Sequence, residues 1–110
     1  MRNSEDFRQT IRSGKRSASP TLVAHVVPGV RGDSGRAAHI SVGFVVSKAV
    51  GPAVVRNRVK RRLRHLMRER LELLPAGSRL VIRALPRAAQ ESASSLASDL
   101  DAALSRSGVL

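Results

Sequence analysis

The sequence predicts a small α+β fold in which one β-sheet is covered by helices. Short runs of β-branched and apolar residues alternate with segments whose apolar residues recur at helical spacing. Proline and glycine separate these segments. With 110 residues, 42% of them hydrophobic, the chain has the size and apolar content of one folded domain, which we place at residues 1–110. The predicted order is α-β-β-α-β-α, with a long basic helix packed on the central sheet.

The first three predicted elements are a helix and two strands. Residues 4–13 form the helix, because Phe7 and Ile11 stand four apart on one apolar face and Gly14 follows as a stop. After a basic loop, residues 21–27 are β-branched and apolar and end at a Pro-Gly pair, as is typical of a strand. Residues 30–38 are predicted as an exposed loop. Residues 40–46 form the next strand, which we expect to run antiparallel to the first.

The second half of the chain contains the longest predicted element. A Gly-Pro pair precedes a helix that we place from Pro52 to Leu74, with the proline in its first turn, and Pro75 ends it. Residues 79–85 (R-L-V-I-R-A-L) form the third strand. Residues 88–105 form a last helix, in which leucine and alanine recur at helical spacing.

Charge is the most unusual bulk property of the chain. Twenty Lys and Arg stand against eight Asp and Glu, which gives a net charge of +12. Such a field attracts polyanions, and nucleic acid and anionic membranes are both possible partners on this ground alone. No apolar run is long enough to span a bilayer, and cysteine is absent. We therefore expect a cytoplasmic protein without disulfides.

The long helix concentrates this charge on one side. Residues 56–70 hold eight of the twenty basic residues and a single acid, Glu69. At about 100° per residue, the apolar residues fall on an arc that should pack on the sheet. These are Val55, Val59, Leu63, Leu66, Met67 and Leu74. The opposite arc carries Asn57, Lys60, Arg61, Arg64 and Arg68, with Arg58 and Arg62 on one shoulder and Arg56 at the boundary.

A solvated helix face would normally mix acids with its bases, because like charges one turn apart repel by a few tenths of a kcal/mol. Here compensating acids are nearly absent from the helix. Arginine is also the side chain that pairs with phosphate through two hydrogen bonds and stacks on bases. The pattern therefore favours polyanion binding over simple solvation.

The ordered residues of this helix resemble the protein component of bacterial ribonuclease P. That family carries the signature Arg-Asn-Arg-x-Lys-Arg-x-x-Arg, which stands complete at residues 56–64. Upstream, residues 43–48 (G-F-V-V-S-K) match the family's strand that ends in Ser-Lys, and Asp6-Phe7 with Gly14 fits its opening helix. The resemblance covers residues 4 to about 105, and the family has the predicted element order.

The resemblance implies two RNA partners. The first is the catalytic RNA of ribonuclease P, whose holoenzyme removes the 5′ leader from precursor tRNA and whose Mg²⁺ is held mainly by the RNA. The second is the precursor tRNA itself. By resemblance, the catalytic RNA would contact Arg56, Asn57, Arg58, Lys60, Arg61 and Arg64, and we extend this surface to Lys48, Arg62 and Arg68.

The resemblance also implies a cleft between the first helix and the sheet that holds the single-stranded leader. Phe7 matches an aromatic of that cleft, although a core anchor for the helix is an equally good interpretation. Ile11 and His25 stand where family members commonly have aromatic residues. Ile11 can pack but cannot stack, whereas His25 can do either.

The sequence shows no catalytic or metal-binding motif of its own. His25, His39 and His65 are scattered, without Cys or acids at metal-ligand spacing. Asp99 and Asp101, two apart on a predicted helix, should point to different faces. This agrees with what the resemblance implies, an endonuclease subunit whose RNA partner supplies the catalysis.

Other functions are less well supported by the sequence. The main alternative is a small ribosomal or RNA-chaperone protein that uses the same helix on another RNA. A DNA-binding helix would need a partner helix and usually a dimer, and neither is indicated. A membrane-surface helix would need bulky apolar anchors, and the apolar arc is required by the sheet.

Overall fold

The computed structural model describes residues 4–27 and 40–108, with side chains from residue 8 onward in the first segment. Ten elements follow one another in this part of the chain. The helices and strands are α1 (Ser4–Ser13), β1 (Lys15–Ala18), β2 (Leu22–Val27), β3 (Ser41–Val45), α2 (Ala53–Arg70), β4 (Arg79–Ala84) and α3 (Ala93–Arg106). Three short 3-10 helices join them: η1 (Lys48–Val50), η2 (Leu71–Leu73) and η3 (Pro86–Ala89).

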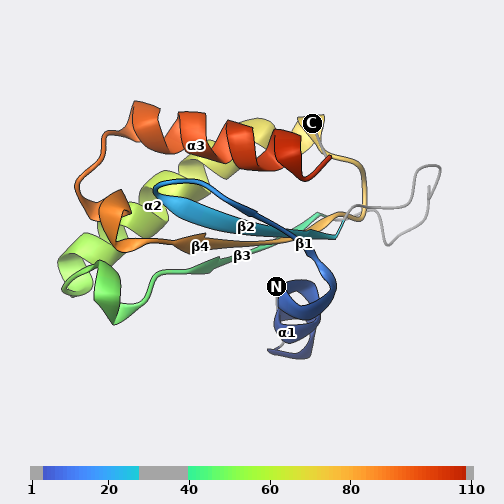
Figure 1. Cartoon of the computed structure of the whole chain (residues 1–110), viewed down its shortest axis with the longest axis horizontal. Helices are drawn as coiled ribbons and strands as arrows, with labels where there is room; N and C mark the ends of the chain where they lie inside the picture. The colour runs from blue at the N-terminus through green and yellow to red at the C-terminus, as the bar shows by residue number, and fades with distance from the viewer. Residues whose placement is uncertain (1–3, 28–39, 109–110) are drawn as a thin grey trace.

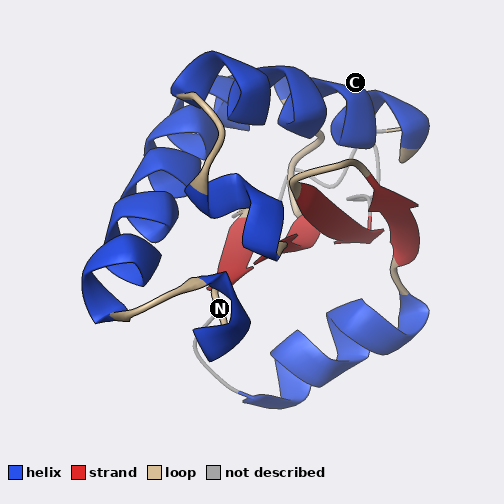
Figure 2. Cartoon of the chain, turned by 60° about the vertical axis from the view of Figure 1, so that its left-hand side comes forward, coloured by secondary structure: helices blue, strands red, loops and turns tan. Residues whose placement is uncertain are grey.

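The strands form one four-stranded sheet in the order β1-β2-β4-β3. β2 is antiparallel to both of its neighbours, whereas β3 runs parallel to β4. α2 and α3 cover one face of the sheet, and α1 lies on the other face against β2 and β4 (Figures 1 and 2). The predicted α+β class, with a sheet packed by a long basic helix, is confirmed.

The hydrophobic core lies between the sheet and the α2–α3 layer. Alternation along the strands turns one set of side chains toward these helices. From the two central strands this set is Leu22, Ala24, Val26, Leu80, Ile82 and Ala84, all buried. α2 and α3 contribute Val59, Leu63, Leu66, Met67, Leu96, Leu100, Ala103 and Leu104 to the same cluster. The helices are thus held by their apolar stripes, which leaves the polar side of each helix exposed.

The predicted element order was wrong in one respect, because it lacks β1. The stretch Lys-Arg-Ser-Ala has no β-branched residue and was predicted as a loop. It forms a strand because β2 offers it a paired edge and because Arg106 of α3 fixes its end. Arg106 donates from Nη2 to the carbonyl of Ala18 at 2.5 Å and from Nε to Ser17 Oγ at 3.0 Å. Tertiary contacts therefore outweigh the weak local preference.

The neighbour of β3 also differs from the simplest expectation. β3 does run opposite to β2, as predicted, but β4 lies between them. β3 pairs with β4 in a parallel register, with Ser41 opposite Arg79 and Val45 opposite Arg83. As a result, the strands before and after α2 are adjacent, and α2 packs over their side of the sheet.

Two predicted helix boundaries need correction. α2 begins at Ala53 and ends at Arg70, so Pro52 is its N-cap and the predicted last residues form η2. α3 begins at Ala93, not residue 88, because Ser92 accepts a hydrogen bond from the N–H of Ser95 and caps it. The segment before this cap is the separate turn η3, which starts with Pro86.

Candidate nucleic-acid interface

The two predicted faces of α2 are confirmed by the burial of its side chains. Val59, Leu63, Leu66 and Met67 are buried against the sheet and α3. The half-buried Val55 lies on the same arc at the start of the helix. Leu74, predicted at the other end of this arc, is buried in the same core but lies beyond the helix, just after η2. The opposite side is exposed to solvent. We call this side the basic row, and it consists of Asn57, Lys60, Arg61, Arg64 and Arg68.

No carboxylate of the described residues pairs with the basic row. The one acid of α2, Glu69, is instead 3.0 Å from His65 Nε2 and 3.8 Å from Arg70 Nη1. The positive charges of the row are therefore not neutralised within the part of the chain that the structure describes. An exposed row of cations with this composition is suited to bind consecutive phosphates.

Arg58 and Arg62, beside the basic row on α2, face the segment that leads into α3. Arg58 donates from Nη2 to the carbonyl of Ala89 at 2.9 Å, and Arg62 donates from Nη1 to the carbonyl of Glu91 at 3.3 Å. Both arginines therefore help to hold α2 against this segment. Because a carbonyl does not cancel the charge of a guanidinium, both still add to the positive field of the helix.

The N-terminal end of α2 is also open to a partner. Its N-cap, Pro52, makes no side-chain hydrogen bond, and its first turn holds no acid. Val54 in that turn is 80% exposed. Lys48 is exposed in η1 just upstream, and Arg56 is half-buried with its Nε lacking a partner among the described residues. The positive end of the helix dipole thus adds to the charge of the side chains.

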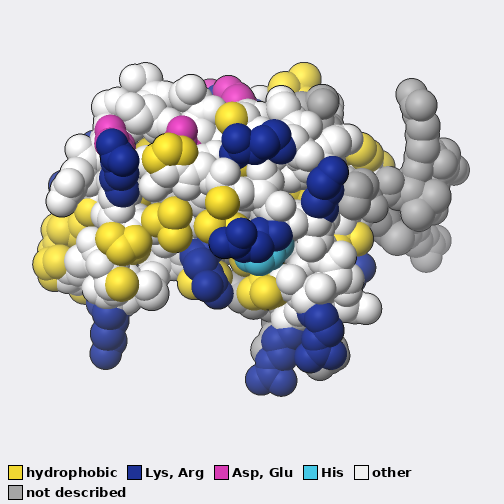
Figure 3. Space-filling view, viewed as in Figure 1, with side chains coloured by type: hydrophobic (Ala, Val, Ile, Leu, Met, Phe, Trp, Pro, Cys, Tyr) yellow, Lys and Arg dark blue, Asp and Glu magenta, His cyan; other side chains and the backbone are white. Residues whose placement is uncertain are grey.

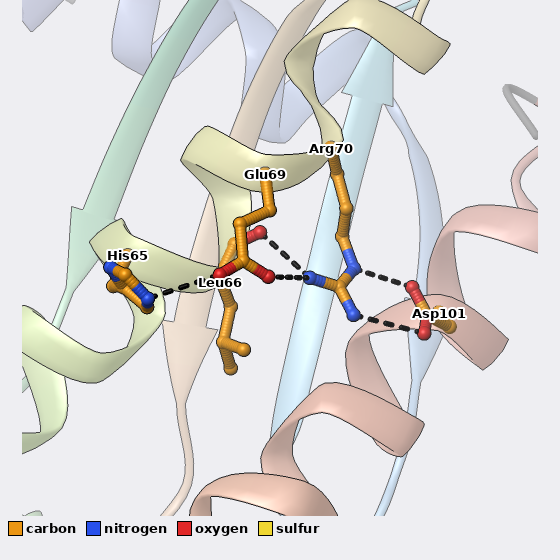
Figure 4. Close-up of polar contacts among 5 residues, drawn as sticks. All are labelled: His65, Leu66, Glu69, Arg70 and Asp101. Carbon is orange, nitrogen blue, oxygen red and sulfur yellow. Dashed lines mark hydrogen bonds and ion pairs between the residues drawn. The ribbon is translucent and has the colours of Figure 1, made fainter.

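Arg70, at the other end of α2, has a different environment. It donates to both carboxylate oxygens of Asp101 on α3, from Nε at 2.5 Å and from Nη2 at 3.1 Å (Figure 4). Its Nη1 also donates to the carbonyl of Leu66 at 2.8 Å. The hydrogen bonds from Arg70 lower the pKa of the Asp101 carboxyl, and this carboxylate raises the pKa of Arg70. This arginine therefore joins α2 to α3.

A second basic surface lies on the sheet face that carries α1. His25 on β2 is 8% exposed, and its Nδ1 has no partner among the described residues. Arg16 stands directly opposite on β1, and Arg83 projects from β4 on the same face. Burial, followed by the charges of Arg83 and Arg16, lowers the pKa of His25. Near neutral pH this group is a neutral imidazole between two cations.

The residues predicted for the leader cleft lie on the elements that the resemblance implied. Ile11 is half-buried on α1, and His25 is buried on the sheet face that α1 covers. The side chain of Phe7 lies outside the described residues, so its role stays a prediction. Arg16 and Arg83 were not predicted for this surface. Arg79, Val81 and Arg83 are alternate residues of β4, so their side chains point to the same face of the sheet. This alternation could have identified Arg83 from the sequence.

Figure 3 shows how the charges are distributed over one side of the molecule. Lys and Arg side chains are spread over this side from the α3 layer to α1, whereas the few Asp and Glu that are visible lie near α3. The acids on α3 bind within the protein. Asp99 accepts from the N–H and the hydroxyl of Thr21, at 3.1 and 2.6 Å, and Asp101 binds Arg70. The two carboxylates have separate partners, as predicted from their spacing.

Neither a metal cluster nor a membrane span is found in residues 4–27 and 40–108. No three His, Asp or Glu side chains lie close enough there to hold a metal ion together. His65 pairs with Glu69, and His39 lies outside the described residues. No helix in this part of the chain combines the length and the apolar character that crossing a bilayer requires.

The comparisons with known proteins agree on one family. The family model described as Ribonuclease P matches residues 1–108. The chain belongs to this family. The ribonuclease P protein component of Streptomyces avermitilis is 54% identical over 111 residues, which cover 96% of this chain and 89% of the relative. That of Nocardioides is 52% identical, over 98% of this chain and 90% of the relative.

A solved structure supports the fold of this family. The ribonuclease P protein of Staphylococcus aureus superposes with a TM-score of 0.82 and covers 99% of this chain and 94% of that one, at 22% identity. Membership makes the chain an RNA-binding protein component of ribonuclease P, the RNA–protein enzyme of tRNA processing, of the kind found in bacteria. The main prediction from the sequence is thus confirmed over the alternative of a ribosomal or chaperone protein.

Proposed function

We propose that the basic row of α2 binds the catalytic RNA of ribonuclease P. The observation that carries this proposal is the row itself, in which Lys60, Arg61 and Arg64 are exposed and no described carboxylate pairs with them. The apolar arc of the same helix is buried, so the row is held on a rigid support. Phosphates of a folded RNA would replace the counterions of this surface, which makes the binding strong and dependent on salt.

The precursor tRNA is the second proposed partner. Its single-stranded leader would lie on the sheet face beneath α1, where Arg16 and Arg83 flank His25. A neutral, buried imidazole is able to pack against a base, and the arginines on both sides of it are able to bind the adjoining phosphates. The two surfaces lie on opposite sides of the sheet, so one protein can hold both RNAs at once.

We propose that the RNA subunit carries out the cleavage itself. No three His, Asp or Glu side chains of the described residues come together as metal ligands, and we assign the Mg²⁺ ion that this chemistry uses to the catalytic RNA. The contribution of the protein is then to hold the substrate and to reduce the repulsion between two polyanions. Both proposed partners are RNAs of the cytoplasm, which is where this proposal places the protein.

Precursor-tRNA cleavage with and without the protein tests this function. The catalytic RNA of a Streptomyces ribonuclease P is incubated with a precursor tRNA at near-physiological Mg²⁺, and the single-turnover rate is measured. We expect the protein to raise the rate strongly at low Mg²⁺ and only weakly at high Mg²⁺, where the ions themselves screen the repulsion. Mature tRNA, which has no leader, tests the second surface. The protein should raise the affinity of the holoenzyme for the precursor but not for this mature tRNA.

One result would contradict the proposal. If the protein binds ribosomal RNA tightly but leaves precursor-tRNA cleavage unchanged at every Mg²⁺ concentration, the assignment to the catalytic RNA is wrong. A narrower test replaces Arg58 and Arg61 with alanine together. This variant should bind the catalytic RNA more weakly and with a flatter salt dependence.

A further inference from the structure

An apolar groove lies between α2 and the edge strand β3, on the sheet face opposite to α1. Ile40, Val42 and Phe44 form one wall, and Met67 and Leu71 form the other. The groove has a volume of about 210 Å³. A cavity of about 150 Å³ takes up a benzene ring, so this hollow has room for a planar heterocycle. Four of these residues, all but Met67, are only half-buried, so the apolar lining reaches solvent.

Two members of the basic row stand at the rim of this groove. Arg64 and Arg68 line it from α2, one helical turn apart. Their Cβ atoms are therefore about 6 Å from each other. Both side chains are exposed and pair with no carboxylate of the described residues. An apolar slot with two free cations at its mouth complements a ligand that has a flat apolar part between two negative groups.

The backbone of β3 adds hydrogen-bonding groups to the same slot. The N–H of Ser41 donates to the carbonyl of Ser78 at 3.0 Å, so alternate residues from Ser41 direct their backbone groups to β4. The N–H and C=O groups of Val42 and Phe44 consequently point to the outer edge of β3, where none of the described strands pairs. A donor and an acceptor thus lie beside the slot.

We propose that this groove binds one unstacked nucleotide of the RNA that α2 holds. The base inserts between the Phe44 wall and the Met67 wall, and the phosphates on either side of it bind Arg64 and Arg68. The inference rests on the proposed function and adds to it a subsite that recognises a base. The hollow on the α3 side of α2, lined by Arg61, Arg62, His65, Leu66 and Ala93, has no phenylalanine in its wall and lies away from the free edge of β3, so it is the weaker candidate.

Fluorine NMR tests whether a base enters the groove. The chain has two phenylalanines, so uniform labelling with 4-fluorophenylalanine gives two signals, and Phe44→Leu assigns them. The probes are hexauridylate, hexaadenylate and an abasic ribose-phosphate hexamer of the same charge. We expect the Phe44 signal to shift with the two base-containing RNAs and not with the abasic one. An equal shift with all three, or no shift, would overturn the proposal.

Affinity for the catalytic RNA provides the second readout. Leu71→Trp fills the groove, whereas Leu73→Trp is the matched control, because Leu73 lies in the same η2 turn, is 62% exposed and does not line the groove. We expect roughly tenfold weaker binding for Leu71→Trp and for Phe44→Leu, as for the loss of one stacked base, and less than twofold for the control. Thermal unfolding of each variant shows that the fold is retained.

The outcomes separate this inference from the proposed function. If the groove variants bind the catalytic RNA as tightly as the unchanged protein, while Lys60→Ala with Arg61→Ala binds weakly, the nucleotide subsite is wrong and the function stands. If the unchanged protein itself does not bind that RNA, the proposed function fails. If Leu71→Trp abolishes dimers detected by sedimentation but not RNA binding, the occupant is a second copy and the proposal is wrong.

Discussion

Arg70 and the three arginines of the basic row lie on the same helix, α2, but differ in their contacts. Arg70 is only 13% exposed in its side chain and binds a carboxylate of α3 and a carbonyl of its own helix. Arg61, Arg64 and Arg68 are exposed, and no described residue neutralises them. The same residue type thus joins two helices at one end of α2 and has no internal partner on the exposed side that carries the basic row. The difference shows that an arginine without an internal partner, held on a rigid helix, is the one available to an external anion.

The largest effect in this comparison is expected from the free group. Lys60→Ala with Arg61→Ala should weaken binding to the catalytic RNA by tenfold or more and reduce the slope of log K against log salt by about two. The unfolding temperature should stay unchanged, because neither side chain has a partner in the described fold. Filter binding at several salt concentrations and thermal unfolding measure the two quantities. A loss of stability with unchanged RNA affinity would reverse the assignment.

The opposite pattern is expected for the joining group. Arg70→Met keeps the apolar stem but removes the hydrogen bonds to Asp101, and should lower the free energy of unfolding by about 1 kcal/mol. The value lies below the usual range for hydrogen bonds to charged groups because the Asp101 side chain is 50% exposed. Urea unfolding measures this change, and Asp101→Asn is the matched control on the other helix. If Arg70→Met lowers RNA affinity as much as Lys60→Ala with Arg61→Ala does, Arg70 does not differ from the arginines of the basic row in its role.

A third substitution should move stability and binding in opposite directions. Ala53 begins α2, whose first turn contains no acid and whose N-cap makes no side-chain hydrogen bond. Ala53→Glu should stabilise the protein by about 0.5 kcal/mol through the helix dipole. The same charge should weaken RNA binding several-fold by repelling phosphate. Ala53→Gln, which has the same shape without the charge, should do neither. If both variants bind RNA equally, this end of the helix does not approach the RNA.

The smallest expected effect concerns the second basic surface and its pH dependence. The pKa of His25 is lowered by burial and by Arg83 and Arg16, so the unfolded chain binds the proton more tightly. Stability should therefore fall as the pH drops below about 6.5, the unfolded value, until the lower folded pKa is passed. His25→Gln should remove most of this change of stability with pH, measured from unfolding curves taken between pH 5 and 7. An unchanged slope would place the titrating group elsewhere.

The pH dependence of the α2–α3 contact has a separate window. Because the pKa of Asp101 is lowered in the fold, its contribution is complete above the unfolded value of about 3.9 and is lost as the pH falls through the folded value. Asp101→Asn should remove that loss. The His25 window begins at about 6.5 and the Asp101 window at about 3.9, so one pH series distinguishes the onset of the histidine effect from that of the carboxylate.

The sequence predicted the faces of α2 well because helical periodicity is a local property. Val59, Leu63 and Met67 are buried, and Lys60, Arg61 and Arg64 are exposed, as their spacing indicated. The sequence could not tell that Arg58 and Arg62 also bind carbonyls, since Ala89 and Glu91 lie 31 and 29 residues further along the chain. Neither could it separate Arg70 from the other arginines, because Asp101 comes from another helix.

The sheet was less predictable because strand pairing depends on contacts between residues that lie far apart in the sequence. β1 has no local strand preference and exists through its pairing with β2 and its contacts with Arg106. The place of β4 between β2 and β3 depends on how the strands meet in space, which periodicity within each strand does not encode. The groove beside β3 follows from that arrangement, so it could not be predicted from the sequence either.

The strand order also has a consequence for synthesis on the ribosome. β4 is the last strand to be made, yet in the described sheet it is the only neighbour of β3 and it separates β3 from β2. When α2 emerges from the ribosome, the sheet against which its apolar side packs still lacks β4, and α3 has not been made. The basic helix can therefore dock fully only after β4 and α3 have also left the exit tunnel. A nascent chain that stops before residue 79 would expose the cations of α2 without the scaffold that orders them.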